Sequence, residues 1–246
     1  MKRKLLLTGA SGRIGSFFLK TYKDDYDFVL TDKREPAETH GYPFHLADLS
    51  DFAAVQALCE GVDTVVHLGA DPSMEATWES LLPNNVIATY NVFEAARLAG
   101  CRRVIFASSI NAVFGYPADV QVHREMPIFP INLYGATKCW GEALGRYYSA
   151  THRLSSICLR FGAVQPRDSS HIDLEHPYID IILTWDDCAR LIASAVNAAD
   201  TISFGIYHGV SENRYKRLDI SSARRELGYA PQDDAFAMAK ARAAAK

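Results

Sequence analysis

The stretch that most constrains the fold of this chain is residues 5–18, LLLTGASGRIGSFF. A short apolar run, as in a buried strand, gives way to Gly9, Gly12 and Gly15 and then to apolar residues at helical spacing. Gly9 can turn the chain sharply, Gly12 can let a pyrophosphate approach the N-terminus of a helix, and Gly15 can let that helix lie close to the sheet. The pattern predicts a strand–turn–helix unit that binds a dinucleotide, with an ordinary strand-to-helix turn as the alternative.

Short β-like runs and longer helix-like segments alternate along the chain. Continuous Val, Ile and Leu runs are typical of strands buried on both faces, and strand–helix repetition implies a parallel sheet with right-handed crossovers. The sequence therefore predicts an α/β fold with a doubly wound parallel sheet. We expect strands at 4–9, 27–32, 43–48, 63–70, 102–109, 155–162 and 202–210, helices at 14–22, 51–61, 79–99, 134–150, 186–198 and 221–227, an irregular loop over 163–181 and a frayed helix over 235–246.

The composition excludes several classes of protein. With 246 residues, 48% of them hydrophobic, and a net charge of −3, the chain can bury one large core and gives no reason to expect nucleic acid or a membrane surface as a partner. The apolar run at 5–7 is too short for a signal peptide, and no stretch approaches the roughly 20 residues that span a bilayer. Five scattered cysteines without a CxxC pair, and histidines without an HxxxH pattern, predict no metal site and a reducing, cytoplasmic location.

An acidic residue ends the second expected strand. Asp32 lies 17 residues after Gly15, where its carboxylate would accept hydrogen bonds from an adenine-ribose diol and repel a 2′-phosphate. This favours NAD over NADP, although Lys33 and Arg34 follow immediately and could pair with such a phosphate. Alternatively, the segment is a solvated turn. Asp48 is expected either to bind the adenine ring or to cap the next helix.

The run YGATK, Tyr134 to Lys138, falls on an expected helix after the strand VIFASS. Residues four apart share one face of a helix, so the phenol and the ammonium can point into one pocket. A close cation, helped by an oxidised nicotinamide ring, would lower the tyrosine pKa from its usual value near 10. Tyr134 could then remove a proton from an alcohol while a hydride leaves for the cofactor.

Seven motifs occur in one order: TGASGRIG, LADLSD, VVHLGA, NNVIATYNVFEAAR, VIFASS, YGATK and CLRFG. Together they cover roughly residues 4–162, and in this the chain resembles the short-chain dehydrogenase/reductase superfamily, in its extended, epimerase/dehydratase-like branch. The resemblance implies an NAD(P)-binding Rossmann core over 1–162 and a Ser–Tyr–Lys catalytic group. It also implies a small C-terminal substrate-binding region over 163–246, packed on the core in one structural domain.

Residue roles follow from the same resemblance. Tyr134 would be the acid/base, Lys138 would hold the nicotinamide ribose, and Asn85 would support the lysine. The cofactor-binding positions would be Gly9, Ser11, Gly12, Arg13, Ile14, Gly15, Asp32, Lys33, Asp48, Leu49, Leu68, Gly69, Ala70, Tyr134, Lys138 and Phe161.

Two ways of counting give different positions for the catalytic serine. The segment SSINAVFG has one residue more between its second serine and Gly115 than the usual pattern of the family. Counting back from that glycine puts Ile110 in the catalytic position, and isoleucine cannot hydrogen-bond a substrate oxygen. Counting forward to Tyr134 gives Ser109. We therefore assign Ser109, with Ser108 as the alternative.

Within the branch, the short C-terminal region makes the chain look like the uronate dehydrogenases, which oxidise a free sugar acid at C1 to its lactone. It departs from them at Ile110 and Asn111, where they carry Asn-His, and at Ala163, where they carry serine. Arg167 is a candidate for binding the substrate carboxylate, and His171 is another. The expected substrate-binding residues are Ser73, Ser109, Ile110, Asn111, Tyr134, Ala163 and Arg167.

Further contacts are less specific. Tyr116, His123 and Trp185 could form the far wall of the pocket or could simply pack, and the loop 164–183 could close over the substrate. The resemblance also suggests a homodimer through helices 79–99 and 134–150, with Trp140, Tyr147 and Tyr148 as exposed anchors.

The leading hypothesis is an NAD-dependent dehydrogenase of a small sugar or sugar acid. The alternatives are an epimerase or dehydratase of a nucleotide-linked or phosphorylated sugar, a carbonyl reductase, and a non-catalytic NAD-sensing protein.

Overall fold

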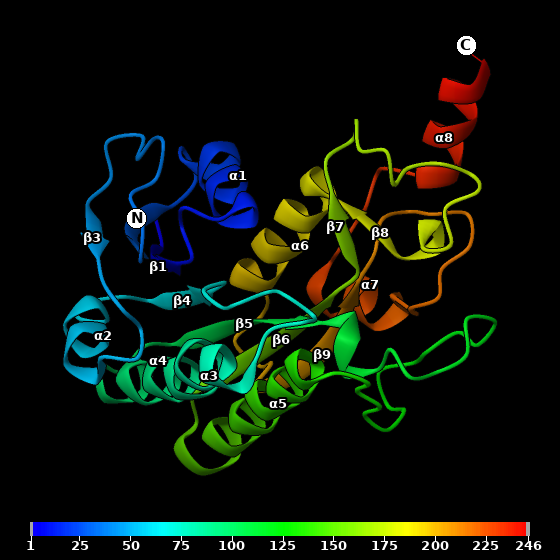
Figure 1. Cartoon of the computed structure of the whole chain (residues 1–246). Coiled ribbons are helices and arrows are strands. Elements are labelled where there is room, and N and C mark those ends of the chain that lie inside the picture. The colour runs from blue at the N-terminus through cyan, green and yellow to red at the C-terminus, as the bar shows by residue number, and fades with distance from the viewer. Residues whose placement is uncertain (1, 245–246) are drawn as a thin grey trace.

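A computed structural model describes residues 2–244 of the chain. Its centre is a seven-stranded, fully parallel sheet in the order β3-β2-β1-β4-β5-β6-β9 (Figure 1). The predicted doubly wound α/β fold is therefore confirmed. The strands of this sheet are β1 (Lys4–Thr8), β2 (Asp27–Asp32), β3 (Phe44–Leu46), β4 (Thr64–His67), β5 (Arg103–Ser109), β6 (Ser155–Phe161) and β9 (Phe204–Gly209).

Helices cover both faces of the sheet and bury a separate apolar cluster on each. One face carries α1 (Arg13–Tyr22), α6 (Trp185–Asn197) and α7 (Ser221–Leu227), and the other carries α2 (Phe52–Leu58), α4 (Ala88–Leu98) and α5 (Leu133–His152). In Figure 1, α1 and α6 lie above the sheet and α2, α4 and α5 lie below it. None of the helices found between residues 2 and 244 is long and apolar enough to cross a bilayer.

Successive strands are added outwards from β1 in one direction, to β2 and β3, and then in the other direction from β4 onwards. The sheet therefore has a switch point between β1 and β4, which lie side by side although β2 and β3 come between them in sequence. Loops that leave the carboxyl ends of such strands diverge to opposite sides and leave a crevice, which is where open α/β sheets bind ligands. The turn after β1 and the loop after β4 both open onto this crevice. The switch point thus places Gly9 opposite Gly69.

The glycine turn is packed backbone against backbone. Gly9 has a φ of +68°, and a Cβ on it would lie 2.7 Å from the Gly69 nitrogen. A Cβ on Gly15 would lie 2.2 Å from the Gly9 carbonyl oxygen. Only glycine fits at these two positions, so α1 starts directly against the end of β1.

The helix predicted over 79–99 is present, with an unexpected middle. It runs as α3 (Trp78–Leu81), a π-helical turn η1 (Leu82–Ile87) and α4. Pro83 has no N–H to donate, so the regular ladder is interrupted there, and the wider turn accommodates the proline without ending the helix. Asn85 lies inside this π turn and is buried.

The prediction of an irregular loop over 163–181 is wrong for its first three residues. Residues Ala163–Gln165 form β7, which pairs in parallel with β8 (Ile182–Thr184), and a short 3-10 turn η3 (Ile179–Ile181) precedes β8. Three-residue strands carry too little pattern to be seen in a sequence when their partner lies so far along the chain. The predicted helical tail is α8 (Ala235–Ala244), and residues 245–246 of that prediction lie outside the described part.

One predicted surface residue is buried. Tyr148 is 1% exposed, stacks on Phe93 at 5.5 Å between ring centroids and donates a hydrogen bond to Glu94 at 3.0 Å. Its expected role as an exposed anchor is therefore wrong, because its side chain is buried between α5 and α4. Trp140 and Tyr147, also on α5, are 40% and 49% exposed.

Gly15→Ala tests the close approach of α1 to β1. The added Cβ would overlap the Gly9 carbonyl oxygen, so we expect the free energy of unfolding to fall by about 2 kcal/mol or more in urea denaturation. Gly12→Ala is the matched control, because its Cβ would lie 3.2 Å from the same oxygen at an ordinary φ of −75°. We expect that control to lose less than about 1 kcal/mol. Equal losses in the two variants would contradict the packing described above.

Candidate active site

The N-terminus of α1 is open to a ligand. Its N-cap residue, Gly12, provides no side-chain cap, and the first turn contains no acidic residue. The N–H groups of this first turn, together with the helix dipole, favour an anion at this end. The turn therefore fits the diphosphate of a dinucleotide, and a side chain at Gly12 would stand in its way. Arg13 is exposed beside this turn and Ile14 is half-buried.

Asp32, at the end of β2, is fixed by two backbone donors. Its carboxylate accepts from the Ser11 N–H at 3.0 Å and from the Lys33 N–H at 2.7 Å. The Lys33 ammonium turns to the other side of the crevice, where it lies 2.9 Å from the Asp48 carboxylate and 2.8 Å from Asn84 Oδ1. Asp32 thus sits where the sequence predicts, and Lys33 already has partners.

Asp48 does not cap a helix. Asp51 is the N-cap of α2 and accepts from the Ala53 and Ala54 N–H groups, so that alternative for Asp48 is wrong. The Asp48 carboxylate is bound by Lys33 and by Ser50. The adenine contact remains a prediction. Of the other expected cofactor residues, Leu49 and Phe161 are buried, and Leu68, Gly69 and Ala70 are half-buried.

A buried chain of hydrogen bonds runs across the switch point from β1 to α4. The Gly69 N–H donates to Thr8 Oγ1 at 3.2 Å, and Thr8 Oγ1 lies 2.8 Å from His67 Nδ1. On the other side, His67 Nε2 lies 3.4 Å from Thr89 Oγ1, which donates to the Asn85 carbonyl at 2.5 Å. Because the Thr89 proton is used, Nε2 must carry the histidine proton and Nδ1 must accept. Burial, together with the nearby Lys138 charge, lowers the pKa of His67 to about 3, so the ring is neutral.

Asn85 joins the loop after β4 to the first turns of α5. Its side chain accepts from the Asp71 N–H at 2.8 Å and donates to the Asp71 carbonyl at 3.0 Å and to Thr137 Oγ1 at 3.1 Å. Thr137 Oγ1 in turn donates to the Tyr134 carbonyl at 2.7 Å. Asn85 therefore contacts Thr137, the residue next to Lys138, and its expected support of the lysine through backbone or water contacts stays a prediction.

Tyr134 and Lys138 lie together on the buried side of α5. Lys138 Nζ is 5.4 Å from the centre of the Tyr134 ring and 5.0 Å from that of Phe106, and it makes no hydrogen bond to a residue in the described range 2–244. Burial lowers the pKa of Lys138 to about 8 and raises that of Tyr134 to about 12, the latter partly offset by the Ser109 side chain. The lowered tyrosine pKa expected from the sequence is thus not produced by the side chains alone.

Ser109 is held by an asparagine network at the start of α5. Its Oγ accepts from the Asn111 N–H at 3.1 Å and from Asn111 Nδ2 at 3.2 Å, which leaves the hydroxyl proton free to donate. Asn132 donates to Asn111 Oδ1 at 2.8 Å and caps α5 by accepting from the Gly135 N–H at 2.7 Å. Ser109 is therefore fixed relative to Tyr134 through the cap of the tyrosine's own helix.

The alternative serine serves a different network. Ser108 donates to Glu142 at 2.6 Å, and Glu142 is paired with Arg160 at 2.7 Å in an almost fully buried ion pair. Ser108 points into this network between β5, α5 and β6, away from the Ser109 side of the strand. The structure gives no support to Ser108 as the catalytic serine.

The expected substrate-binding residues are only partly brought together. Ser109, Asn111 and Tyr134 lie close to one another, whereas the Ile110 side chain is buried in the main core cluster. Ser73 is exposed in the loop after β4, and Ala163 is half-buried on β7.

The expected carboxylate-binding arginine is already paired. Arg167 donates to both carboxylate oxygens of Asp233 at 2.9 and 3.0 Å and lies 3.4 Å from Asp186. His171, the other candidate, is exposed, contacts Ser169 at 3.1 Å and packs on His176 at 4.8 Å between ring centroids. The Arg167 guanidinium would have to leave Asp233 before it could bind a substrate carboxylate.

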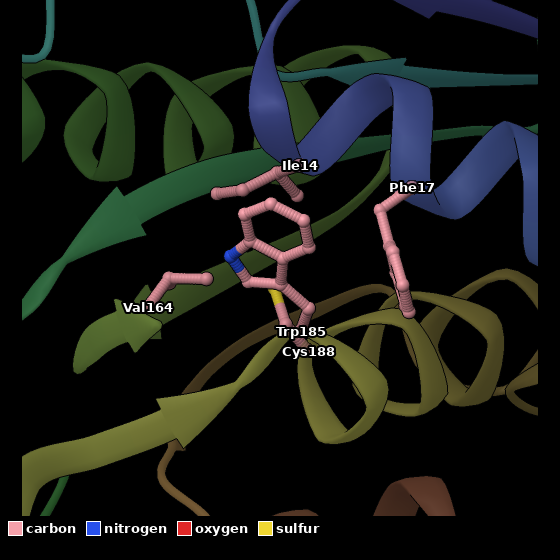
Figure 2. Close-up of a pocket in the computed structure, with 5 residues that line it drawn as sticks. All are labelled: Ile14, Phe17, Val164, Trp185 and Cys188. Atoms are coloured by element: carbon pink, nitrogen blue, oxygen red, sulfur yellow. The ribbon is translucent and has the colours of Figure 1, made fainter. Parts of the chain in front are cut away.

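The three residues proposed for a far wall do not meet. Figure 2 shows the Trp185 indole surrounded by Ile14, Phe17, Val164 and Cys188, in a crevice between α1 and α6. Tyr116 packs on Phe129 at 5.5 Å between ring centroids, and His123 faces Asp219 at 3.6 Å. Trp185 therefore adjoins the glycine turn through Ile14 but does not share a wall with the other two.

The sequence reading missed several residues that hold this site. His67 stood in the motif VVHLGA, and Asn132, three residues before Gly135, has the spacing of a helix N-cap, so both had a local signal. Thr8, Thr89 and Thr137 also lie within quoted motifs, TGASGRIG, NNVIATYNVFEAAR and YGATK. A motif does not show which hydroxyls bond to one another, because their partners lie far along the chain.

Comparison with known proteins identifies the family. A model of the NAD dependent epimerase/dehydratase family matches residues 5–169. A curated NAD-dependent glucose-6-phosphate dehydrogenase from Haloferax volcanii is 36% identical over 95% of this chain and 95% of its own length. A uronate dehydrogenase from Pseudomonas putida is 31% identical over 94% of this chain and 84% of its own length.

Solved structures agree. A variant of uronate dehydrogenase from Agrobacterium tumefaciens, complexed with NAD, has a TM-score of 0.87 and 29% identity over 99% of this chain and 90% of the other. The predicted family and its NAD cofactor are confirmed, as is the likeness to uronate dehydrogenases. The chain belongs to the NAD dependent epimerase/dehydratase family.

Proposed function

We propose that this chain is an NAD-dependent dehydrogenase that oxidises an aldose or a sugar acid at C1 to the corresponding lactone. The observation that carries the proposal is the grouping of Ser109, Tyr134 and Lys138 at the carboxyl ends of the central strands, next to an open glycine turn. Relatives that match nearly all of the chain are named as dehydrogenases of glucose 6-phosphate, uronate and L-arabinose, which supports it.

Residues of the chain fit NAD at three points. The uncapped N-terminus of α1 at Gly12 suits the diphosphate, and the Asp32 carboxylate suits the hydroxyls of a ribose. Lys138 offers a buried ammonium group without a protein acceptor in the described range, and a second ribose would satisfy it. When bound, NAD supplies the hydride acceptor and a positive charge that favours the phenolate of Tyr134.

Asp32 and Lys33 favour NAD over NADP. The carboxylate would repel a 2′-phosphate, and the Lys33 ammonium is already neutralised by Asp48 at 2.9 Å. A phosphate would have to displace that pair before it gained a cation. Lys33 therefore contributes less to NADP binding than its place in the sequence predicts.

In the proposed reaction, Tyr134 and Ser109 act on the C1 hydroxyl. The Ser109 O–H, left free by its two asparagine donors, would donate to the substrate oxygen and hold it near Tyr134. The Tyr134 Oη would take the hydroxyl proton as the C1 hydrogen departs as hydride, so that C1 becomes the lactone carbonyl. The Lys138 ammonium, protonated below its pKa of about 8, would stabilise the phenolate.

Two observations favour a dehydrogenase over the other hypotheses. The match to the glucose-6-phosphate dehydrogenase spans 95% of both chains, whereas the matches to two UDP-glucose 4-epimerases, one of them putative, span 65% and 59% of this chain and 55% and 47% of theirs. A non-catalytic sensor has no need of a buried tyrosine–lysine pair, and burying that lysine without a partner costs stability.

We also propose that two copies pair through η1, α4 and α5. These elements present large apolar side chains to solvent, namely Ile87, Tyr90, Leu98, Trp140 and Tyr147. Trp140 Nε1 donates to the Val86 carbonyl at 3.3 Å, so the helices form one continuous face that a two-fold copy could cover.

Tyr134→Phe tests the catalytic assignment. Loss of the Oη removes the proton acceptor, so we expect kcat for NAD reduction to fall at least about 100-fold. NAD affinity, measured by calorimetry, should stay within about threefold of wild type, because the tyrosine ring remains. Tyr22→Phe, whose hydroxyl contributes nothing to the site, is the matched control. Full activity in Tyr134→Phe would show that another group moves the proton.

The dimer is tested by sedimentation equilibrium. We expect a mass of twice 27.3 kDa for the wild type and a shift towards the monomer in Trp140→Glu, because a charge cannot be buried at the centre of an apolar face. A monomeric wild type at micromolar concentration would rule the pairing out.

A further inference from the structure

A second depression lies at the same edge of the sheet as Ser109 and Tyr134. It is a groove of about 420 Å³ between three separate segments. Its lining residues are 118–121, Asp180 and 214–217. None of these residues belongs to the NAD-binding or proton-transfer groups described above.

The topology places this groove beyond the catalytic group, on the side away from the glycine turn. The segment 118–121 follows β5 and its 3-10 turn η2 (Ile110–Ala112), Asp180 follows β6, and 214–217 follow β9. In the order β3-β2-β1-β4-β5-β6-β9, the glycine turn leaves β1 and Ser109 ends β5. A substrate with its reacting carbon at Ser109 therefore has the crevice of the cofactor on one side and this groove on the other.

An aromatic pair adjoins the wall of the groove. Phe114 follows η2 and lies 5.7 Å from the Tyr178 ring, measured between centroids. The Arg217 guanidinium lies 5.9 Å from the centre of the same Tyr178 ring, at the wall of the groove. The segment that leaves Ser109 at the end of β5 therefore packs, through Phe114, against a residue that contacts the groove wall.

The three cationic side chains of the groove differ in how many acceptors of the protein they already bind. Arg217 makes a two-point ion pair with Asp180 at 3.0 and 3.1 Å, and Lys216 is held by Glu212 at 2.9 Å and by the Asn213 carbonyl at 2.6 Å. Arg214 is exposed, lies 5.5 Å from the centre of the Tyr215 ring and pairs with no carboxylate of the described residues. Arg214 is therefore the available guanidinium, on a wall that its paired neighbours hold rigid.

The expected substrate-binding residues around Ser109 provide no free guanidinium, and the nearby Lys138 ammonium is assigned to the cofactor ribose in the proposed function. Ile110 and Ala163 are apolar, and the Arg167 guanidinium is held by Asp233 and Asp186. An anionic group on the substrate would therefore gain little beside the reacting carbon. It would gain a two-point hydrogen bond from a free arginine at the groove.

We propose that this groove binds the anionic group that an aldose substrate carries at the end remote from C1, with Arg214 as its main contact and Lys216 as a second donor. The anion is a carboxylate or a phosphate, both of which match the guanidinium fork. The proposal rests on the proposed function, since it concerns the substrate of that site. It makes Arg214 a residue that determines specificity, without a part in hydride transfer.

Arg214→Ala tests the proposal with three sugars that share the same C1 group: glucose, glucuronate and glucose 6-phosphate. We expect the wild type to prefer one of the two anionic sugars. The substitution should lower kcat/KM for that sugar about tenfold, mainly through KM, and leave glucose within about twofold. Arg214→Lys should restore part of the loss. Lys20→Ala, which removes one exposed charge from α1, is the matched control and should change none of the three values.

The preferred sugar identifies the anion, since glucuronate indicates a carboxylate and glucose 6-phosphate indicates a phosphate. Equal losses for charged and neutral sugars, or no loss, would overturn the proposal. So would a wild type that prefers glucose.

A binding measurement separates this proposal from the proposed function. Calorimetric titration of the NAD-free protein with glucose 6-phosphate, glucuronate and inorganic phosphate needs no turnover. Binding of one of these anions that weakens about tenfold in Arg214→Ala supports the groove even if no sugar reduces NAD, an outcome in which only the proposed function fails. Unchanged binding in the variant, or no binding of any of the three to the wild type, overturns the groove.

Discussion

The close contact between the backbones of Gly9, Gly15 and Gly69 is the constraint on which the rest of this structure depends. No side chain fits between these residues, so the turn after β1, the first turn of α1 and the loop after β4 lie directly against one another. The N–H groups at the start of α1 are thereby exposed at the switch point of the sheet, where they can meet an anion. The same contact brings Thr8 and His67 within 2.8 Å.

From that contact a polar network extends to α5, the helix that carries Tyr134 and Lys138. Neutral His67 links the end of β1 to Thr89 and the Asn85 carbonyl, and the Asn85 side chain links Asp71 to Thr137 on α5. Each buried donor in this network has an acceptor, as a dry interior requires. Lys138 differs, because its ammonium group is buried and meets no protein acceptor in residues 2–244. In the proposed function, a ribose hydroxyl of NAD would supply the missing acceptor.

The fold could be predicted from the sequence because its signals are local. Strand β2 (Asp27–Asp32) was predicted residue for residue from its apolar run, and α1 from the glycines before it. The π turn around Asn85 could not be predicted, since α- and π-helical segments share nearly the same apolar spacing. Strands β7 and β8 were missed because each has only three residues and because Pro166 and a run of polar residues follow β7 directly, which is typical of a loop.

The residues of the site also fall into those that could be predicted from the sequence and those that could not. Tyr134, Lys138 and Asp32 carry motifs, and their grouping follows from strand order alone. A sequence motif does not show whether a charged side chain is free or forms an ion pair. Arg167 stood out in the sequence, yet Asp233, 66 residues away, holds it. Arg214 had no signal, yet three loops from β5, β6 and β9 place it beside an open groove.

In the proposed reaction, hydride leaves C1 of a sugar. An aldose deuterated at C1, in a reaction with NAD followed by mass spectrometry of both products, shows whether it does. We expect the deuterium to appear on the reduced nicotinamide, the sugar product to be a lactone without it, and kcat/KM to fall through an isotope effect. Reduced cofactor without deuterium, or a sugar that keeps its C1 label while another carbon changes, would contradict it.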